Sequence, residues 1–129
     1  MGFFKRYKTD KTLEENGVWV DLGEDVHVLV GRLTSKRTRE VRRRLMRPYE
    51  SMREVPPELE DKINIQVMAE AVLLDWRGIT DEEEKAIPYS REAAIKLLSD
   101  FPDFRDEVAG ASLRRDIFRA NELEGNSKA

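Results

Sequence analysis

The spacing of hydrophobic residues changes along the chain, and the first regular pattern predicts β-structure. Residues 18–22 and 26–30 are rich in β-branched side chains and partly alternate apolar with polar positions. The residues between them, Gly23-Glu24-Asp25, form a short glycine-containing loop, so the two segments predict an antiparallel hairpin. Because an isolated hairpin is only marginally stable in water, one face must pack on helices or pair with the sheet of another copy.

From residue 35 the spacing becomes helical. Val41, Leu45, Tyr49 and Met52 recur at intervals of four, four and three on one predicted face, and arginines occupy the other faces. Pro48 lies inside this stretch, where its ring removes a backbone hydrogen bond. We therefore expect the helix to bend or break just before Pro48.

The most apolar stretch of the chain runs from Ile63 to Trp76 and has apolar residues on nearly all sides. It follows Pro56-Pro57 and an acidic segment that suits the first turn of a helix. Apolar residues all round predict a helix that is buried on more than one face. Ser90 can cap a short helix after it, and Asp103 can cap a last helix reaching Phe118.

The expected fold is mainly α with a small N-terminal β-hairpin, an α+β arrangement of four to five helices packed around the central apolar helix. Residues 17–122 are expected to form a single globular domain. Residues 1–16 are expected to be a flexible arm, and residues 123–129 a flexible tail.

Composition supports one soluble domain in a reducing compartment. Hydrophobic residues make up 40% of the 129 positions and charged residues 38%. The chain has no cysteine, which excludes disulfides and thiolate metal sites and suits the cytoplasm. No run approaches the roughly 18 apolar residues needed to cross a bilayer, and residues 1–11 are too charged for a signal peptide, so no membrane partner is expected.

The net charge of −3 hides a basic segment. Residues 32–53 carry nine Lys or Arg against only Glu40 and Glu50. Four of these arginines fall at helical spacing and are the candidate interaction residues: Arg39, Arg42, Arg43 and Arg47. Such a strip could bind a protein, contact phosphates, or form salt bridges with the acidic part of this chain or a neighbour.

Candidate chemistry is otherwise sparse, and we expect neither an enzyme nor a bound cofactor. The only histidine, His27, lies on a predicted strand, and the chain has no cysteine. The side chains that most often act as acid, base or nucleophile near neutral pH are therefore almost absent. The acidic run 81–84 lacks the alternating ligands and the turn glycine of a calcium loop. No catalytic residue or metal ligand is assigned.

Three short segments carry a resemblance to a known family: Ala69-Glu70-Ala71-Val72-Leu73-Leu74-Asp75-Trp76-Arg77-Gly78-Ile79-Thr80-Asp81, Ile87-Pro88-Tyr89-Ser90-Arg91-Glu92-Ala93-Ala94, and Leu97-Leu98-Ser99-Asp100-Phe101-Pro102-Asp103. They resemble the tail assembly chaperones of phages with long, non-contractile tails (siphophages). The residues that carry the likeness are Trp76, Gly78, Pro88, Tyr89, Ser90, Leu97, Leu98 and Pro102. In this likeness Gly78 ends a helix whose end Trp76 covers, and Ser90 caps the next helix. One departure is that similar sequences commonly have a glycine in the acidic loop, where this chain has Glu83-Glu84-Lys85-Ala86.

The resemblance implies a non-enzymatic protein in the host cytoplasm. It would bind the tape measure protein, keep it soluble, help recruit tail tube protein and be absent from the finished tail. The family often has a short form and a frameshift-extended form, and a chain ending in Glu124-Gly125-Asn126-Ser127-Lys128-Ala129 would match the short one. Coating a long client implies a homo-oligomer, formed through the hairpin edge or the arginines. The alternative is a nucleic-acid-binding regulatory protein using the basic segment Arg32–Arg53, less favoured because the sequence pI is near 5.4.

Overall fold

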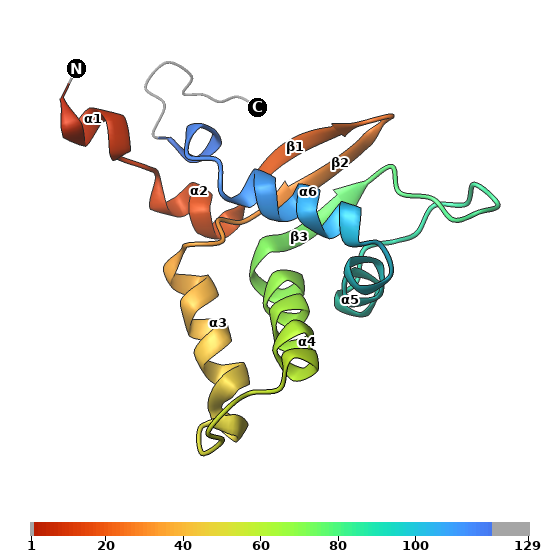
Figure 1. Ribbon diagram of the computed structural model, residues 1–129. Helices are drawn as coiled ribbons and strands as arrows, with labels where there is room; N and C mark the ends of the chain where they lie inside the picture. Colours follow the sequence, from red (N-terminus) through yellow and green to blue (C-terminus); the bar gives the residue numbers. More distant parts are fainter. Residues whose placement is uncertain (1, 120–129) are drawn as a thin grey trace.

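The computed structural model describes residues 2–119 and has an α+β fold (Figure 1). Within those residues six α-helices accompany one three-stranded sheet. The helices are α1 (Phe3–Tyr7), α2 (Lys11–Asn16), α3 (Lys36–Met46), α4 (Pro57–Val67), α5 (Arg91–Asp100) and α6 (Pro102–Ser112). The strands are β1 (Val18–Gly23), β2 (Val26–Val30) and β3 (Leu73–Arg77). Three shorter helical segments are η1 (Arg47–Tyr49), η2 (Met68–Val72) and η3 (Asp116–Phe118).

The predicted hairpin is confirmed, and a third strand joins it. β1 and β2 pair antiparallel with Val18 opposite Val30 and Val20 opposite Val28. β3 pairs antiparallel with the other side of β2, so the sheet order is β1-β2-β3. Because β3 covers the free edge of β2, the hairpin obtains its extra pairing partner from its own chain.

The predicted central helix from Ile63 to Trp76 is wrong in its second half. Helix α4 ends at Val67, a π-helical turn follows as η2, and the chain then continues as β3. The apolar pattern is the same for a buried helix and a buried strand, and pairing with β2 stabilises the strand. Trp76 therefore lies on a strand, and Gly78 follows that strand instead of ending a helix.

The core lies between the sheet and the helices that cover one of its faces. Figure 1 shows α6 crossing the sheet, with α5 and the upper end of α4 beside it. Val28 and Val30 of β2, Leu73 of β3, Leu98 of α5 and Val108 of α6 are all fully buried. The central apolar segment thus contributes to the core from η2 and β3 as well as from α4.

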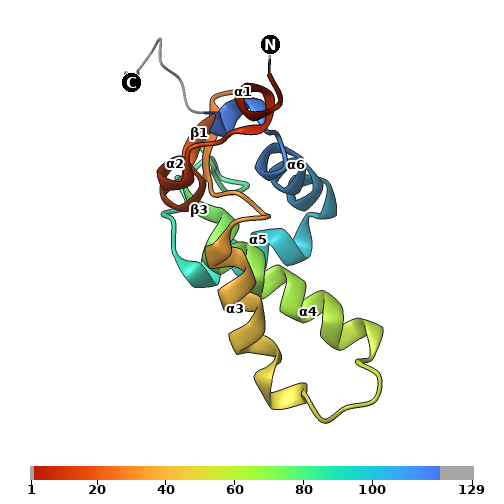
Figure 2. The same cartoon turned by 90° about the vertical axis from the view of Figure 1, so that its left-hand side faces the viewer.

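Helices α3 and α4 form a hairpin that projects away from the sheet (Figure 2). The predicted break before Pro48 is confirmed, because α3 ends at Met46 and η1 follows. Met52, predicted on the same buried face as Val41, is instead 42% exposed. The chain leaves the helical path before it reaches Met52, so the helical spacing no longer applies there.

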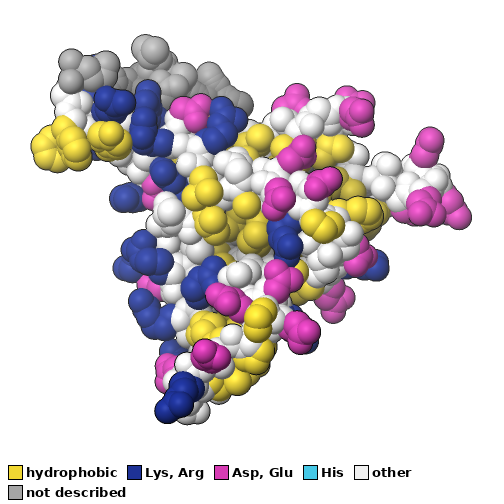
Figure 3. Space-filling model, viewed as in Figure 1, with side chains coloured by type: hydrophobic (Ala, Val, Ile, Leu, Met, Phe, Trp, Pro, Cys, Tyr) yellow, Lys and Arg dark blue, Asp and Glu magenta, His cyan; other side chains and the backbone are white. Residues whose placement is uncertain are grey.

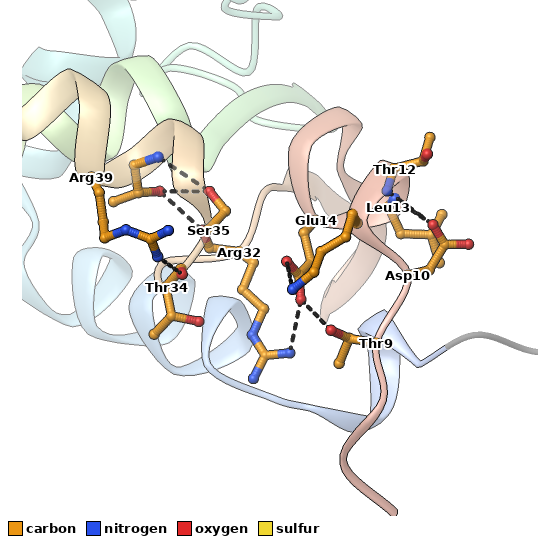
Figure 4. A network of polar contacts seen from close by, with 11 residues as sticks. Thr9, Asp10, Thr12, Leu13, Glu14, Arg32, Thr34, Ser35 and Arg39 are labelled. Atoms are coloured by element: carbon orange, nitrogen blue, oxygen red, sulfur yellow. Dashed lines mark hydrogen bonds and ion pairs between the residues drawn. The ribbon is translucent and has the colours of Figure 1, made fainter. Parts of the chain in front are cut away.

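The ends of the described chain meet beside the sheet. Residues 3–7 and 11–16 are helical, and Asp10 caps α2 by accepting hydrogen bonds from the backbone amides of Thr12 and Leu13. Glu14 is buried and accepts a hydrogen bond from Thr9, and its carboxylate pairs with Arg32 (Figure 4). The predicted tail, residues 123–129, lies outside the described residues.

The last predicted helix also differs from expectation. Pro102 is its first residue, so Asp103 lies in the first turn and Phe101 occupies the capping position. The helix ends at Ser112, and Phe118 is buried from the separate segment η3. Among the described residues, no helix is long and apolar enough to cross a membrane.

Candidate functional site: the projecting helical hairpin

The basic segment folds into one side of the projecting hairpin. Ser35 caps α3 by accepting a hydrogen bond from the amide of Thr38, and Val41 faces the core. In Figure 3 dark blue side chains follow the outer, left-hand edge of the hairpin, where α3 lies. At 100° per residue, four residues lie opposite the buried face, and we call them the arginine strip: Lys36, Arg39, Arg43 and Arg47.

The structure separates Arg42 from the other three predicted arginines. Arg42 is half-buried and donates a hydrogen bond of 2.6 Å to the side-chain oxygen of Asn64 on α4. It therefore braces the two helices of the hairpin against each other. Arg39 is exposed and donates to the carbonyl oxygen of Thr34 at 3.0 Å, next to the helix cap (Figure 4).

Arg43 and Arg47 are the arginines of the strip that are free to meet a partner. Both are exposed, and neither forms a hydrogen bond or ion pair with any residue in the range 2–119. An exposed guanidinium with no intramolecular partner keeps all five donors for carboxylates or phosphates.

A second group of cations surrounds Glu70 in η2, and the sequence did not indicate it. Arg44 hydrogen-bonds the Glu70 carboxylate at 2.5 Å, and Arg91 of α5 lies 3.5 Å from it. The guanidinium of Arg37 also reaches the Glu70 carbonyl oxygen at 3.5 Å. These arginines are thus partly neutralised within the chain. The only available sign was a single acidic residue inside an otherwise apolar run.

An open groove of about 310 Å³ runs between the two helices of the hairpin. Half-buried apolar residues form its floor, and Arg44 and Lys62 stand among the polar residues that line it. We call it the hairpin groove. Its apolar residues are Leu45, Pro48, Tyr49, Leu59 and Ile63. The helical spacing of Leu45 and Tyr49 is visible in the sequence, but spacing alone does not distinguish a buried face from the lining of a groove.

Two of the residues that carry the family likeness, Trp76 and Tyr89, pack together beside β3. The indole nitrogen of Trp76 donates to the carbonyl oxygen of Ile87 at 2.7 Å, and the Trp76 and Tyr89 rings pack edge to face. The Tyr89 hydroxyl donates to the carbonyl oxygen of Leu73 at 2.7 Å. Burial raises the pKa of this phenol above its usual value, while the neighbouring Arg91 acts in the opposite direction.

The remaining residues of the likeness start or fill helices. Ser90 caps α5 by accepting a hydrogen bond from the Ala93 amide, as predicted. Leu98 is fully buried and Leu97 packs against the core, whereas Pro88 and Pro102 are exposed. The arrangement is therefore a structural clip that holds the chain after β3 against the domain.

The acidic loop at 81–84 is closed by its own hydrogen bonds. The Asp81 carboxylate accepts from the amides of Glu83 and Lys85. Glu84 has a φ of +65°, so a non-glycine residue takes the left-handed conformation in this loop. Within residues 2–119 no group of three or more His, Cys, Asp or Glu side chains is placed to hold a metal ion. His27 lies opposite Asp21 on the sheet.

Comparison with known proteins gives one match. A family model described as the YdaY prophage protein matches residues 33–128, well over half of the chain. The matched range contains α3, the hairpin groove and the clip around Trp76. No curated protein and no solved structure matches the chain.

Proposed function

Because this chain belongs to the YdaY prophage protein family, we propose that it is a phage tail assembly chaperone acting in the host cytoplasm. In this role it binds the tape measure protein, keeps it soluble and helps recruit tail tube protein, and it works with a frameshift-extended form of itself. Phage origin and the resemblance of residues 69–103 to such chaperones support the proposal. The observation that carries it is the projecting α3–α4 hairpin with its hairpin groove.

The groove has the features needed to hold an amphipathic helix. Apolar anchors on one side of a client helix would cover the half-buried floor residues such as Leu45 and Leu59. Lys62 at the groove would favour acidic residues beside those anchors, whereas Arg44 is already paired with Glu70. The proposed client segment is therefore an amphipathic helix with acidic flanks.

The arginine strip adds long-range attraction for the same client. Arg43 and Arg47 are exposed cations without an intramolecular partner in the described residues. Such charges raise the rate of association with an acidic partner, and this effect weakens as salt screens them.

The test uses the double reversal Arg43→Glu/Arg47→Glu, which spares the bracing residue Arg42. A matched control, Lys5→Glu/Lys8→Glu, makes the same charge change at exposed residues outside the hairpin that form no ion pair within residues 2–119. Each chain is co-expressed with the tape measure protein encoded nearby, and the soluble fraction and affinity are measured. Wild type and control should keep the client soluble, and the strip variant should bind at least about fivefold more weakly at low salt, with the difference shrinking at high salt.

Two results would overturn the proposal. One is a wild-type protein that neither binds the tape measure protein nor keeps it in solution. The other is a strip variant and a control that lose affinity equally. Circular dichroism and thermal unfolding establish beforehand that both variants are folded.

Nucleic-acid binding is the second candidate function, because the arginine strip could also follow a phosphate backbone. The exposed side chain of Glu40 on α3 and the overall acidity of the chain oppose it. If the four residues of the strip each neutralised one phosphate, the logarithm of DNA affinity would fall with the logarithm of salt at a slope of roughly −3.6. Fluorescence anisotropy with duplex and single-stranded oligonucleotides measures this slope.

A further inference from the structure

Helix α1 carries a cluster of aromatic side chains that the body of the protein leaves exposed. Phe3 is 71% exposed, Phe4 83% and Tyr7 46%, and no residue of the helix is buried. At 100° per residue the three rings share one side of the helix. In Figure 3 they belong to the yellow group at the upper left, where Figure 1 places α1, and basic side chains lie beside it. An apolar patch of this kind on a surface is typical of a site that meets a partner or a membrane.

The other side chains of this segment are basic. Lys5, Arg6 and Lys8 alternate with the aromatic residues, and residues 2–9 contain no acidic residue. Within the described part of the chain none of these three cations forms an ion pair. By angle around the helix, Lys5 and Arg6 occupy the sides that the rings leave open. Helix α1 is thus short and amphipathic, with an aromatic face and cationic flanks.

The part of the body that carries α1 is basic as well. Residues 2–17 and 113–119 are joined by an isolated antiparallel bridge, and together they carry seven Lys or Arg against four Asp or Glu. One of those acids is the buried Glu14, whose charge is met by Arg32. Among the described residues, this end of the molecule is therefore positively charged, although the whole chain has a net charge of −3.

Helix α1 projects from the body and is held in that position. Figures 1 and 2 place it at the opposite end of the molecule from the tip of the α3–α4 hairpin. The guanidinium carbon of Arg115 lies 4.8 Å from the centre of the Tyr7 ring, and Asp10 caps the helix that follows. A projecting group touches a flat surface before the body does, so a planar partner can reach Phe3 and Phe4.

The rings are arranged for insertion as a group and not for stacking with bases. Phe3 contacts both other rings, with centroid separations of 5.8 Å to Phe4 and 4.8 Å to Tyr7. The guanidinium carbons of Arg6 and Arg115 lie 5.6 Å and 4.8 Å from the centre of the Tyr7 ring. Platforms for single-stranded nucleic acid instead offer open ring faces to successive bases. Clustered rings beside cations suit the surface of an anionic membrane, where rings lie at the headgroup level and cations meet phosphates.

We propose that α1 attaches the protein reversibly to membranes of anionic phospholipid. Phe3 and Phe4 insert into the boundary between headgroups and acyl chains. Lys5, Arg6 and Lys8 stay among the headgroups and pair with lipid phosphates. The expectation of no membrane partner rested on the lack of a spanning run, which an interfacial helix does not need. This inference goes beyond the proposed function and uses residues outside the hairpin.

Flotation with lipid vesicles tests the inference on the full, untagged chain without a client. Wild type should bind vesicles made of equal parts of phosphatidylglycerol and phosphatidylcholine. Vesicles of phosphatidylcholine alone should bind it at least about tenfold more weakly, because they lack the negative surface that attracts the cations. Raising the salt concentration should weaken binding to the anionic vesicles, because salt screens those cations.

Two double variants separate the contribution of charge from that of the rings. Lys5→Glu/Lys8→Glu should weaken binding to anionic vesicles at least about 25-fold, because each cation near such a surface contributes about fivefold. Phe3→Ser/Phe4→Ser should lose detectable binding, because the remaining charges attract the chain without anchoring it.

Each variant has a matched control at exposed positions far from α1. Arg53→Glu/Lys85→Glu makes the same charge change at the hairpin tip and in the acidic loop. Met52→Ser/Phe101→Ser removes two exposed apolar side chains. Both controls should bind anionic vesicles like wild type. Circular dichroism and thermal unfolding establish that all four variants are folded.

A tryptophan at the tip of α1 measures insertion directly. The fluorescence of Phe4→Trp, after subtraction of the wild-type signal from Trp19 and Trp76, should shift to shorter wavelengths on anionic vesicles. Lipids brominated on their acyl chains should quench it. A signal that neither shifts nor is quenched on vesicles that bind the protein would show adsorption by charge alone, and the inference would be wrong.

Two further results would overturn the inference: a wild type that does not bind anionic vesicles, and α1 variants that bind like their controls. If wild type binds a labelled single-stranded oligonucleotide but no vesicles, and Phe3→Ser/Phe4→Ser abolishes that binding, α1 is a nucleic-acid platform. The proposed function is tested separately, because Phe3→Ser/Phe4→Ser should still bind the tape measure protein. Failure of vesicle binding with retained tape measure binding would leave the proposed function intact.

Discussion

The guanidinium carbon of Arg77 lies 4.0 Å from the centre of the Trp19 ring, although the strands that carry them are separated by β2. The two side chains therefore reach toward each other across the middle strand, on the sheet face opposite the buried Val28 and Trp76. This contact links the two outer strands through side chains alone. It should stabilise the addition of β3 to the predicted hairpin.

A double-mutant cycle with Trp19→Leu and Arg77→Met measures this contact. Both replacements keep apolar bulk while they remove the cation or the aromatic ring. We expect a coupling free energy of about 0.5–1 kcal/mol in denaturant unfolding, as for exposed cation–π pairs. If the effects of the two single substitutions on the free energy of unfolding add to that of the double variant within about 0.3 kcal/mol, the contact contributes no stability.

Glu14 should be far more important to stability than its neighbour Glu15. Glu14 is 6% exposed and lies 3.4 Å from Arg32, whose side chain is 14% exposed. Glu14→Ala leaves the Arg32 charge largely buried without its partner, so unfolding free energy should fall by about 3 kcal/mol. Glu15→Ala, at an exposed position of the same helix, should change it by less than about 0.5 kcal/mol. Equal losses of unfolding free energy for Glu14→Ala and Glu15→Ala in urea titrations would contradict the role of Glu14 as the partner of Arg32.

Replacement by alanine should destabilise the protein at one glycine, Gly78, and stabilise it at another, Gly110. Gly78 has a φ of +84°, and an added Cβ would lie 2.0 Å from the Asp25 carbonyl oxygen. Gly78→Ala should therefore lower the free energy of unfolding by at least about 2 kcal/mol. Gly110 lies inside α6, and nothing lies within reach of an added Cβ. Gly110→Ala should therefore raise the free energy of unfolding by about 0.5–1 kcal/mol. Thermal and urea unfolding measure both, and a neutral Gly78→Ala would show that the turn can move.

Tyr89 should make stability depend on alkaline pH. Burial raises the pKa of the folded phenol above its usual value of 10.0, so the unfolded chain loses this proton first. The stability that the protonated Tyr89 phenol contributes is fully present below pH 10.0. It is lost as the pH rises through the pKa of the folded phenol.

The matching variant is Tyr89→Phe, which removes both the ionisation and the hydrogen bond to Leu73. At about pH 8 it should be less stable than wild type by about 1 kcal/mol, the value of a typical hydrogen bond. This gap should narrow as the pH is raised above 10.0. A gap that stays constant across urea titrations up to about pH 11 would contradict the burial of the phenol.

Elements with local signals were predictable from the sequence. The hairpin followed from β-branched alternation around Gly23, and the end of α3 followed from the covalent geometry of Pro48. Ser90 was identified as a cap because its hydroxyl bonds a backbone amide only three residues away. The match to a phage family agrees with the phage origin implied by residues 69–103.

The candidate site was predictable only as a list of arginines. Helical spacing put four of them on one helix, but Arg42 turned out to brace Asn64 while Arg43 and Arg47 stay exposed. Arg39 donates to Thr34 only five residues away, Arg42 to Asn64 twenty-two residues away, and Arg43 and Arg47 have no partner among the described residues. No periodicity within α3 contains that information.

The sequence by itself determined the hairpin, the starts of α3 and α5, and the end and the basic character of α3, because each depends on residues within a few positions of one another. Only the tertiary structure decided that Leu73–Arg77 is a strand, since its backbone hydrogen bonds go to β2, more than forty residues earlier. The hairpin groove and the contact of Arg42 with Asn64 were decided in the same way. Each depends on how separate helices pack, and packing is a property of contacts between distant segments, not of local spacing.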